Sequence, residues 1–153
     1  FCPLCNSSLV FDRRLDGAVL DFGTTGLLQK SNLVMYDRQT ESWWQQILGE
    51  AIVGEYTGAI LTQLPSAIVS FEDFAGAYPD GKVVNRDTGA SRPYGNNPYR
   101  GYDDIDQSPF LFRGKVDPRL PPMERVMQIS IDGEDKLYPF SRLKGKGVVN
   151  DRV

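Results

Sequence analysis

The most informative absences in this chain of 153 residues concern histidine and cysteine. There is no His, so these residues alone cannot build a Ser-His-Asp triad, a His-paired Cys nucleophile or a His-based zinc site. Only two cysteines are present, which are too few for a disulfide framework. Because Phe1 is not a Met, we expect sequence upstream of it, and that sequence would have to supply any imidazole.

The chain also lacks an excess of positive charge and a long apolar run. Its net charge is −3 and its charged residues are interspersed, so we expect no nucleic-acid partner, because no basic stripe exists to neutralise phosphates. No stretch approaches the roughly 18–20 apolar residues of a membrane helix, and we expect no membrane span. The length fits a single domain, 1–153, with an ordinary 41% of hydrophobic residues.

Short β-prone segments alternate with turn residues along most of the sequence. Two Asp-Gly pairs, at 16–17 and 132–133, lie between such segments and predict hairpins over 8–22 and 125–138. Further short strands are expected at 33–37, 51–55, 60–64 and 82–85. The pattern therefore predicts a mainly β fold, a hairpin-rich sheet or a barrel-like one, with one or two short helices. An α+β fold is the alternative.

One helix is predicted over Ser70–Tyr78, where Ser70 can cap the first turn and acidic residues follow it. Phe71, Phe74 and Tyr78 share one face of this helix, and that spacing predicts core packing. A second short helical turn is expected over 141–144, after a proline.

Residues 86–122 contain many glycines and prolines and few aliphatic side chains, so we expect a long loop or linker there. Tyr and Arg are the residue types that anchor interfaces, and Tyr94, Tyr99 and Arg100 are therefore candidates for gripping a small ligand or a protein partner. An exposed Trp43 or Trp44 would assist in such a binding module. The plain alternative is an ordinary polar surface loop.

The two cysteines form the motif Cys2-Pro3-Leu4-Cys5, which has several possible roles. Asn6 in place of His excludes haem attachment. A pair of thiolates can hold copper(I), whereas structural zinc needs about four ligands, so copper or zinc is the candidate cofactor with help from outside the motif. Thiol redox chemistry, a disulfide and two simply buried thiols remain the alternatives.

A dense polar segment, 35–46, follows the apolar strand predicted at 33–37. Such groups are costly to bury unless each finds a partner, so the segment is either a satisfied network that fixes a turn or a pocket with converging polar groups. Asp37 and Glu41 could act as an acid and a base or as ligands of a hard metal ion. The pocket candidates are Tyr36, Asp37, Arg38, Glu41, Trp44 and Gln45. If the pocket also included Cys2 and Cys5, the sulfurs and carboxylates would lie within about 8 Å of each other.

Several longer motifs closely resemble the domain-of-unknown-function family numbered 3179. They include Cys-Pro-Leu-Cys-Asn at 2–6, Val-Phe-Asp-Arg at 10–13, Leu-Val-Met-Tyr-Asp-Arg-Gln-Thr-Glu-Ser at 33–42, Gly-Glu-Ala-Ile-Val-Gly at 49–54, Pro-Asp-Gly-Lys-Val at 79–83 and the Tyr-Gly-x-Asn-Pro-Tyr segment at 94–99. The resemblance covers most of the chain.

The resemblance implies an uncharacterised bacterial or archaeal protein, and because many members look exported or lipid-anchored it implies an extracytoplasmic location. In such proteins a segment with a His-Glu pair and an Asn-Asp pair precedes the cysteine motif. Residues 123–153 look like a C-terminal hairpin unit that repeats this segment, with Gly147-Val148 where His-Glu would stand. The resemblance therefore predicts a fragment that lacks N-terminal strands, and it implies no reaction.

Two functional hypotheses follow. The first is an extracytoplasmic metal-binding or thiol-redox module built on Cys2 and Cys5. The second is a non-catalytic module that binds a ligand or a protein through the loop with Tyr94, Tyr99 and Arg100. The sequence assigns no catalytic residue and does not decide whether the protein is an enzyme.

Overall fold

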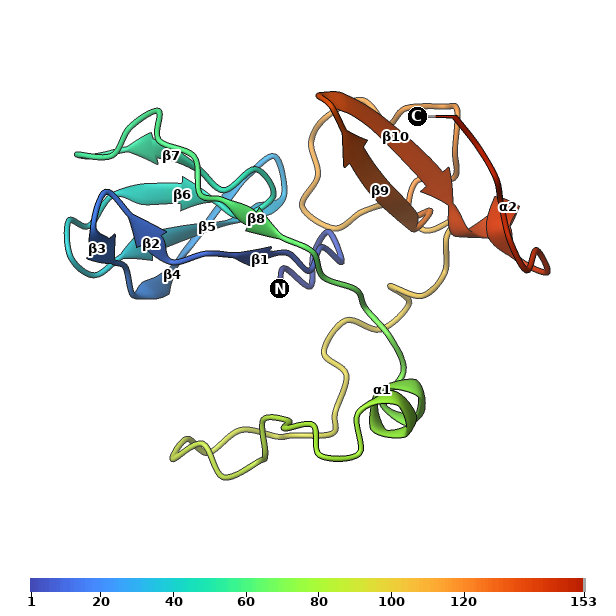
Figure 1. Ribbon diagram of the computed structural model, residues 1–153, viewed down its shortest axis with the longest axis horizontal. Coiled ribbons are helices and arrows are strands. Elements are labelled where there is room, and N and C mark those ends of the chain that lie inside the picture. Colours follow the sequence, from blue (N-terminus) through green and yellow to red (C-terminus); the bar gives the residue numbers. More distant parts are fainter. Residues whose placement is uncertain (153) are drawn as a thin grey trace. The chain divides into compact units, whose positions relative to one another are not determined.

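The computed structural model describes residues 1–152, and the chain forms two compact units, Phe1–Pro98 and a second that begins at Tyr99 (Figure 1). In both units more residues lie in strands than in helices, which confirms the prediction of a mainly β fold. In chain order the elements are β1 (Val10–Phe11), β2 (Arg14–Leu15), β3 (Ala18–Val19), β4 (Phe22–Gln29), β5 (Asn32–Asp37), β6 (Trp43–Gln45), β7 (Glu50–Val53), β8 (Gln63–Leu64), α1 (Phe71–Ala77), β9 (Val126–Ile131), β10 (Glu134–Pro139) and α2 (Phe140–Leu143).

The main sheet of the first unit is antiparallel, with the order β4-β5-β6-β7. Successive side chains of a strand point to opposite faces. Met35 of β5 pairs with Trp44 of β6, and both contribute to the inner face, whereas the next pair, Tyr36 and Trp43, belongs to the outer face. The strand predicted at 33–37 is confirmed in this way as the second strand of the sheet.

The core lies on the inner face of this sheet. Leu20, Trp44, Ala51 and Leu61 form its buried cluster, and the Trp44 side chain is completely shielded from solvent. The Phe22 ring meets the Trp44 ring edge-on, at 5.7 Å between centroids. Burying one large side chain of this kind stabilises a fold by about 2–3 kcal/mol, so Trp44 is the main anchor of the first unit.

Two short ladders complete the strands of the first unit. β2 pairs with β3 across Asp16-Gly17, so the first predicted hairpin is confirmed, although its strands are only two residues long. β1 pairs with β8, and β8 is the last part of the strand predicted at 60–64. The strand predicted at 82–85 is wrong, because this segment has no regular structure and Val84 is 92% exposed. β-propensity alone does not make a strand without a neighbouring strand to pair with.

The helix α1 confirms the prediction of a capped helix after residue 69. The backbone N–H of Asp73 donates to the Ser70 hydroxyl at 3.0 Å, which is the expected N-terminal cap. The predicted core packing is wrong, since no residue of α1 is buried and Phe71 is 70% exposed. Phe74 instead contacts Tyr78, at 5.7 Å between ring centroids. An apolar helix face shows which side could be covered, but not that anything covers it.

The second unit consists of the hairpin β9–β10, the short helix α2 and a long irregular segment. Six residue pairs join β9 to β10 around Asp132-Gly133, as predicted, and α2 confirms the second helical turn. The described residues of this unit include none that is buried. The predicted loop 86–122 contains no helix or strand. Across residues 1–152, none of the helices has the length and apolar character needed to cross a membrane.

Candidate functional site: the cysteine hook and its amide network

The two cysteines lie on a tight loop at the start of the first unit. The backbone N–H of Cys2 donates to the Ser7 carbonyl at 2.9 Å, and the N–H of Ser7 donates to the Cys2 carbonyl at 3.2 Å. Residues 3–6 form the loop between them, and Asn6 takes a positive φ of 48° there. We call residues 2–7 the cysteine hook. Both cysteines are free thiols, so the hook brings two oxidisable sulfur atoms onto one turn.

Cys2 is the buried member of the pair, with 1% of its surface exposed. Its thiol donates to the Ser31 carbonyl at 3.9 Å. Burial raises the pKa of Cys2, and the neighbouring Cys5 adds to this effect. Cys2 therefore stays protonated to higher pH than an ordinary cysteine.

The Ser31 carbonyl belongs to the tight turn that joins β4 to β5. Lys30 and Ser31, its two central residues, have φ of 49° and 65°. Positive φ at both central positions is the requirement of a type I′ hairpin turn, which normally selects Asn, Asp or Gly. Neither residue is of that kind, so the Cys2 contact falls on a turn with a strained backbone.

Cys5 is the exposed member of the pair, but polar groups surround its sulfur on one side. The Asn32 side-chain amide donates to Cys5 Sγ at 3.1 Å, and the Ser7 hydroxyl lies 3.2 Å from the same sulfur. Desolvation opposes ionisation of Cys5, but hydrogen bonds from Ser7, Cys2 and Asn32 outweigh it and lower its pKa. The two thiols of the hook thus have opposite tendencies to ionise.

Buried amide side chains hold this arrangement from the sheet. Asn32, at the start of β5, is 4% exposed, and Gln46, just after β6, is 2% exposed. The Asn32 amide donates to Gln46 Oε1 at 2.8 Å, and the Ser7 hydroxyl donates to the same oxygen at 2.7 Å. Every one of these buried polar groups has a partner, as a stable buried network requires. We call Ser7, Asn32 and Gln46 the amide network.

The polar cluster expected around Asp37 lies at the other end of β5. Asp37 follows Asn32 by five residues of extended strand, a span of about 17 Å at about 3.3 Å per residue. The structure therefore does not bring the carboxylate of Asp37 and the sulfur atoms of Cys2 and Cys5 into one pocket. The two sets of candidate residues are separate features of the same sheet.

Asp37 is completely buried, and its carboxylate contacts residues of the turn between β5 and β6 and of β6 itself. Its carboxylate accepts from the Trp44 indole N–H at 2.9 Å and from the backbone N–H and hydroxyl of Thr40 at 2.6 and 2.9 Å. Burial acts to raise the pKa of Asp37, but these donors outweigh it and lower the pKa. Because both of its carboxylate oxygens accept hydrogen bonds and it has no solvent access, Asp37 has a structural role.

The other candidates of this segment point in different directions. Arg38 lies over the Tyr36 ring, 5.5 Å from its centroid, and also donates to the Tyr36 hydroxyl. Glu41 is exposed in the turn with a φ of 58°, whereas Gln45 is buried in β6 and pairs with Val34 and Glu50. These side chains do not converge on one point.

The Tyr/Arg candidates of the long loop belong to different units. Tyr94 is in the first unit and contacts Thr88 through their hydroxyls, whereas Tyr99 and Arg100 are in the second unit, where Tyr99 packs on Tyr102. Of the two tryptophans, Trp43 is 37% exposed and Trp44 is in the core.

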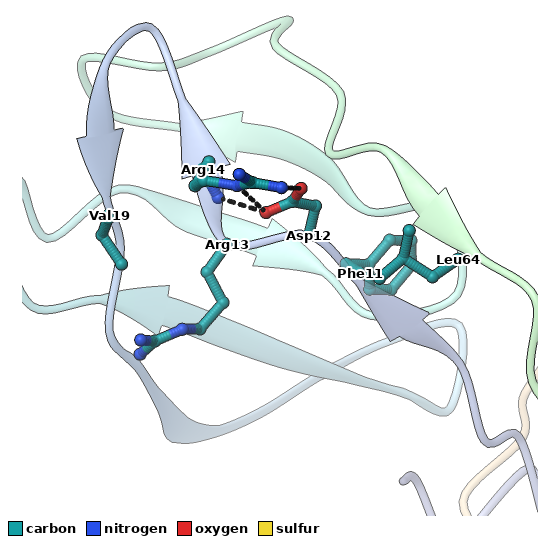
Figure 2. A pocket seen from close by; sticks show the side chains of 6 residues that line it. All are labelled: Phe11, Asp12, Arg13, Arg14, Val19 and Leu64. Carbon is teal, nitrogen blue, oxygen red and sulfur yellow. Dashed lines mark hydrogen bonds and ion pairs between the residues drawn. The ribbon is translucent and has the colours of Figure 1, made fainter.

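A hollow of about 380 Å³ lies beside the β2–β3 hairpin, and Figure 2 shows its lining of Phe11, Asp12, Arg13, Arg14, Val19 and Leu64. Two nitrogens of the Arg14 guanidinium donate hydrogen bonds to the Asp12 carboxylate, and this lowers the pKa of Asp12 to about 2. Arg13 is paired with Asp21. Each arginine already has a carboxylate partner, and none of the residues proposed from the sequence lines the hollow.

Within residues 1–152 no three His, Cys, Asp or Glu side chains come together in a way that could hold a metal ion. Two thiols at the hook are what the described residues offer a soft metal. Compared with known families, the whole chain, residues 1–153, matches the family described as "Protein of unknown function (DUF3179)". The chain belongs to this family. Comparison with curated proteins and with solved structures found no match to either.

In this DUF3179 chain, sequence reasoning located the cysteines and included Gln46 in the polar segment 35–46, but it missed Ser7 and Asn32 and did not connect Gln46 with the cysteines. The only local signal was a Ser two residues after the Cys-x-x-Cys motif. Asn32 lies 27 positions after Cys5 and contacts it, and Gln46 lies 41 positions after Cys5 and meets Asn32 only because β5 and β6 are neighbours in the sheet. Such a long-range contact leaves no periodicity in a single sequence.

Proposed function

We propose that this protein is a thiol–disulfide exchange module in which Cys5 is the attacking thiol and Cys2 the resolving thiol. The observation that carries the proposal is the Asn32 amide, which donates from a buried network to the sulfur of the exposed residue Cys5 at 3.1 Å, while Cys2 is buried. The thiolate is the nucleophile in such exchange, so a thiol with stabilised charge and solvent access is the one that attacks.

The reaction is balanced with a disulfide as the second reactant. The Cys5 thiolate attacks one sulfur of the disulfide, a mixed disulfide forms and the other sulfur leaves as a thiolate that takes up a proton. Cys2 then loses its proton and attacks Cys5 Sγ, which releases the second thiol. The substrate disulfide gains two electrons and two protons, and the hook ends with a Cys2–Cys5 disulfide. The reverse direction oxidises a dithiol substrate.

Metal binding by the same pair is the alternative, and the state of Cys2 favours redox chemistry. A metal ligand must be a thiolate, and binding releases its proton. Cys2 is buried, donates its proton to the Ser31 carbonyl and has a raised pKa, so ionising it is costly. A resolving thiol, by contrast, ionises only after the mixed disulfide has formed, when the Cys5 charge is gone.

The test uses glutathione disulfide as the probe, with the reduced protein and its Cys2→Ser and Cys5→Ser variants. We expect intact-mass measurement to show an internal disulfide in the unchanged protein, a stable glutathione adduct on Cys5 in Cys2→Ser, and at least a tenfold slower reaction in Cys5→Ser, since Cys2 is buried and less ionised. Equal rates for the two variants would contradict the assignment of roles.

The metal alternative is measured in the same samples. Reduced protein is incubated with zinc(II) or copper(I), desalted and assayed for retained metal. Retention that is lost in both Cys→Ser variants, together with no internal disulfide in the unchanged protein, would overturn the redox proposal in favour of metal binding. An extracytoplasmic location remains part of the proposal, because disulfides persist in such compartments.

A further inference from the structure

The proton arrangement of the amide network can be worked out group by group, beginning with Asn32. Its side-chain oxygen accepts the backbone N–H of Ile47 at 3.0 Å, which fixes the orientation of the amide. The two N–H groups of the amide therefore face the other way. One donates to Cys5 Sγ at 3.1 Å and the other to Gln46 Oε1 at 2.8 Å. Asn32 has no proton left to redistribute.

Gln46 is fixed by the same kind of argument. Its Nε2 faces the Ser7 carbonyl at 3.5 Å, which directs Oε1 toward the Ser7 hydroxyl and the Asn32 amide. Oε1 can only accept hydrogen bonds. It therefore takes the Ser7 hydroxyl proton whenever that proton is available.

Ser7 is the member of the network with a choice. Its hydroxyl carries one proton and has two neighbours, Gln46 Oε1 at 2.7 Å and Cys5 Sγ at 3.2 Å. While Cys5 is a thiol, Ser7 can donate to Gln46 and accept the Cys5 proton, and all three groups are satisfied. Once Cys5 is a thiolate, the sulfur also needs a donor, and Ser7 can supply one only by turning its proton away from Gln46.

We propose that Gln46 competes with Cys5 for the single hydroxyl proton of Ser7 and thereby sets how readily Cys5 becomes a nucleophile. When Ser7 turns to the thiolate, Gln46 Oε1 keeps the Asn32 donor, so no buried group is left without a partner. Ser7 and Gln46 are positioning residues in this proposal, because they act through Cys5 and touch no substrate. The inference deepens the proposed function and rests on Cys5 as its reactive thiol.

The other groups that could move the ionisation of Cys5 are few. Cys2 is the titratable neighbour, and it contributes to the lowered pKa of Cys5. In the segments that contain the hook, Asn32 and Gln46, residues 2–7, 29–33 and 45–48, the charged side chain is the exposed Lys30. Neither is altered by substitutions at Ser7 or Gln46, so a change in Cys5 after such substitutions reports on the hydroxyl proton.

The experiment measures the rate of Cys5 alkylation by iodoacetamide as a function of pH, in a Cys2→Ser background that leaves one sulfur. Ser7→Ala removes a donor to the thiolate. We expect the midpoint of the curve of alkylation rate against pH to rise by about one pH unit, which is the effect of losing a hydrogen bond to a charged group. Gln46→Met removes the competing acceptor at similar volume, and we expect the midpoint to fall by about half a unit. Gln46→Glu places a negative charge at position 46, and we expect it to raise the midpoint.

A double-mutant cycle gives the decisive comparison. In the Ser7→Ala background there is no proton to compete for, so Gln46→Met should no longer lower the midpoint. Gln45→Met makes the same chemical change one residue earlier and should leave the midpoint where it is. Thermal melting checks that each variant is folded. Should Gln46→Met not fold, the Ser7→Ala and Gln46→Glu midpoints carry the test, and a fall in either contradicts the proposal.

A rise with Gln46→Met, or a fall of the same size with and without Ser7, would overturn the proposal. Alkylation needs no disulfide partner, so this result is separate from that of the glutathione experiment. The proposed exchange can fail while the midpoints behave as expected, and the midpoints can disagree while exchange is observed.

Discussion

Two hairpins of this chain have the same turn and different surroundings. In β2–β3 the central residues Asp16 and Gly17 have φ of 49° and 81°, and in β9–β10 Asp132 and Gly133 have φ of 50° and 84°. The second hairpin has six residue pairs against two, yet only the first touches a core, through Leu15 and Ala18. Turn chemistry therefore makes a hairpin but does not decide whether it is buried.

The same contrast separates the two ends of the chain. Every buried residue among the described ones lies between Cys2 and Leu61, and none lies in the second unit. Substitutions at chemically similar positions in the two regions should therefore have very different costs. The free energy of unfolding from denaturant titration measures this difference at pairs of matched positions.

The largest difference is expected for large apolar side chains. Trp44→Ala removes a completely buried ring and leaves a cavity, and we expect a loss of about 3–5 kcal/mol or failure to fold. Leu137→Ala, in β10, truncates a side chain that is 55% exposed and should cost less than about 1 kcal/mol. Equal losses at the two positions would show that the hairpin β9–β10 is covered in solution.

The next comparison uses two carboxylates with lowered pKa values. Asp37→Asn puts an N–H group among the donors of Trp44 and Thr40, and we expect a loss of about 2–3 kcal/mol at pH 7. Asp135→Asn changes a fully exposed carboxylate that accepts from Ser130 and Gln128, and its effect should be barely measurable.

The Asp37 effect should also depend on pH. Its pKa is lower in the folded than in the unfolded chain, so its stabilisation is complete above the unfolded value of about 3.9 and is lost as the pH falls through the folded value. Titrations repeated at several acidic pH values should therefore show the Asp37→Asn protein and the unchanged protein converging. A constant difference down to strongly acidic pH would mean that the carboxylate charge is not the cause.

The smallest comparison concerns two glycines with positive φ. Gly49 has a φ of 65°, and a Cβ there would lie 2.6 Å from the Phe11 ring, whereas a Cβ on Gly133 would meet no atom within 4 Å. Gly133→Ala should cost about 1 kcal/mol for the backbone alone, and Gly49→Ala about 2 kcal/mol because the ring must also move. The same loss of unfolding free energy at both positions would show that the Phe11 ring moves aside without an energetic penalty.

Much of the local structure was predictable because its causes are local. Asp-Gly pairs between β-prone runs gave both hairpins, and Ser70 followed by acidic residues gave the start of α1. The β4–β5 turn was missed because Lys30 and Ser31 are not the Asn, Asp or Gly that such a turn normally selects. The prediction that one face of α1 packs in the core was wrong because no neighbouring element covers that face.

The candidate site also has some features with local causes and others that depend on long-range contacts. A pair of cysteines two residues apart was visible in the sequence, and so was the polar segment around Asp37. That the segment fixes a turn, while Asn32 contacts Cys5 and is itself bonded to Gln46, depended on which strands lie side by side. Residue type alone could not distinguish the amide that contacts sulfur from the many that do not.

By itself the sequence determined the turns, the capped helix and the presence of two neighbouring thiols, because these follow from backbone preferences and from residues a few positions apart. Only the tertiary structure decided that one thiol is buried and the other exposed to solvent and hydrogen-bonded, and that residues 2–61 contain the core. Solvation and hydrogen-bond partners depend on groups brought together from distant parts of the chain, and the reactivity of a sulfur atom depends on both.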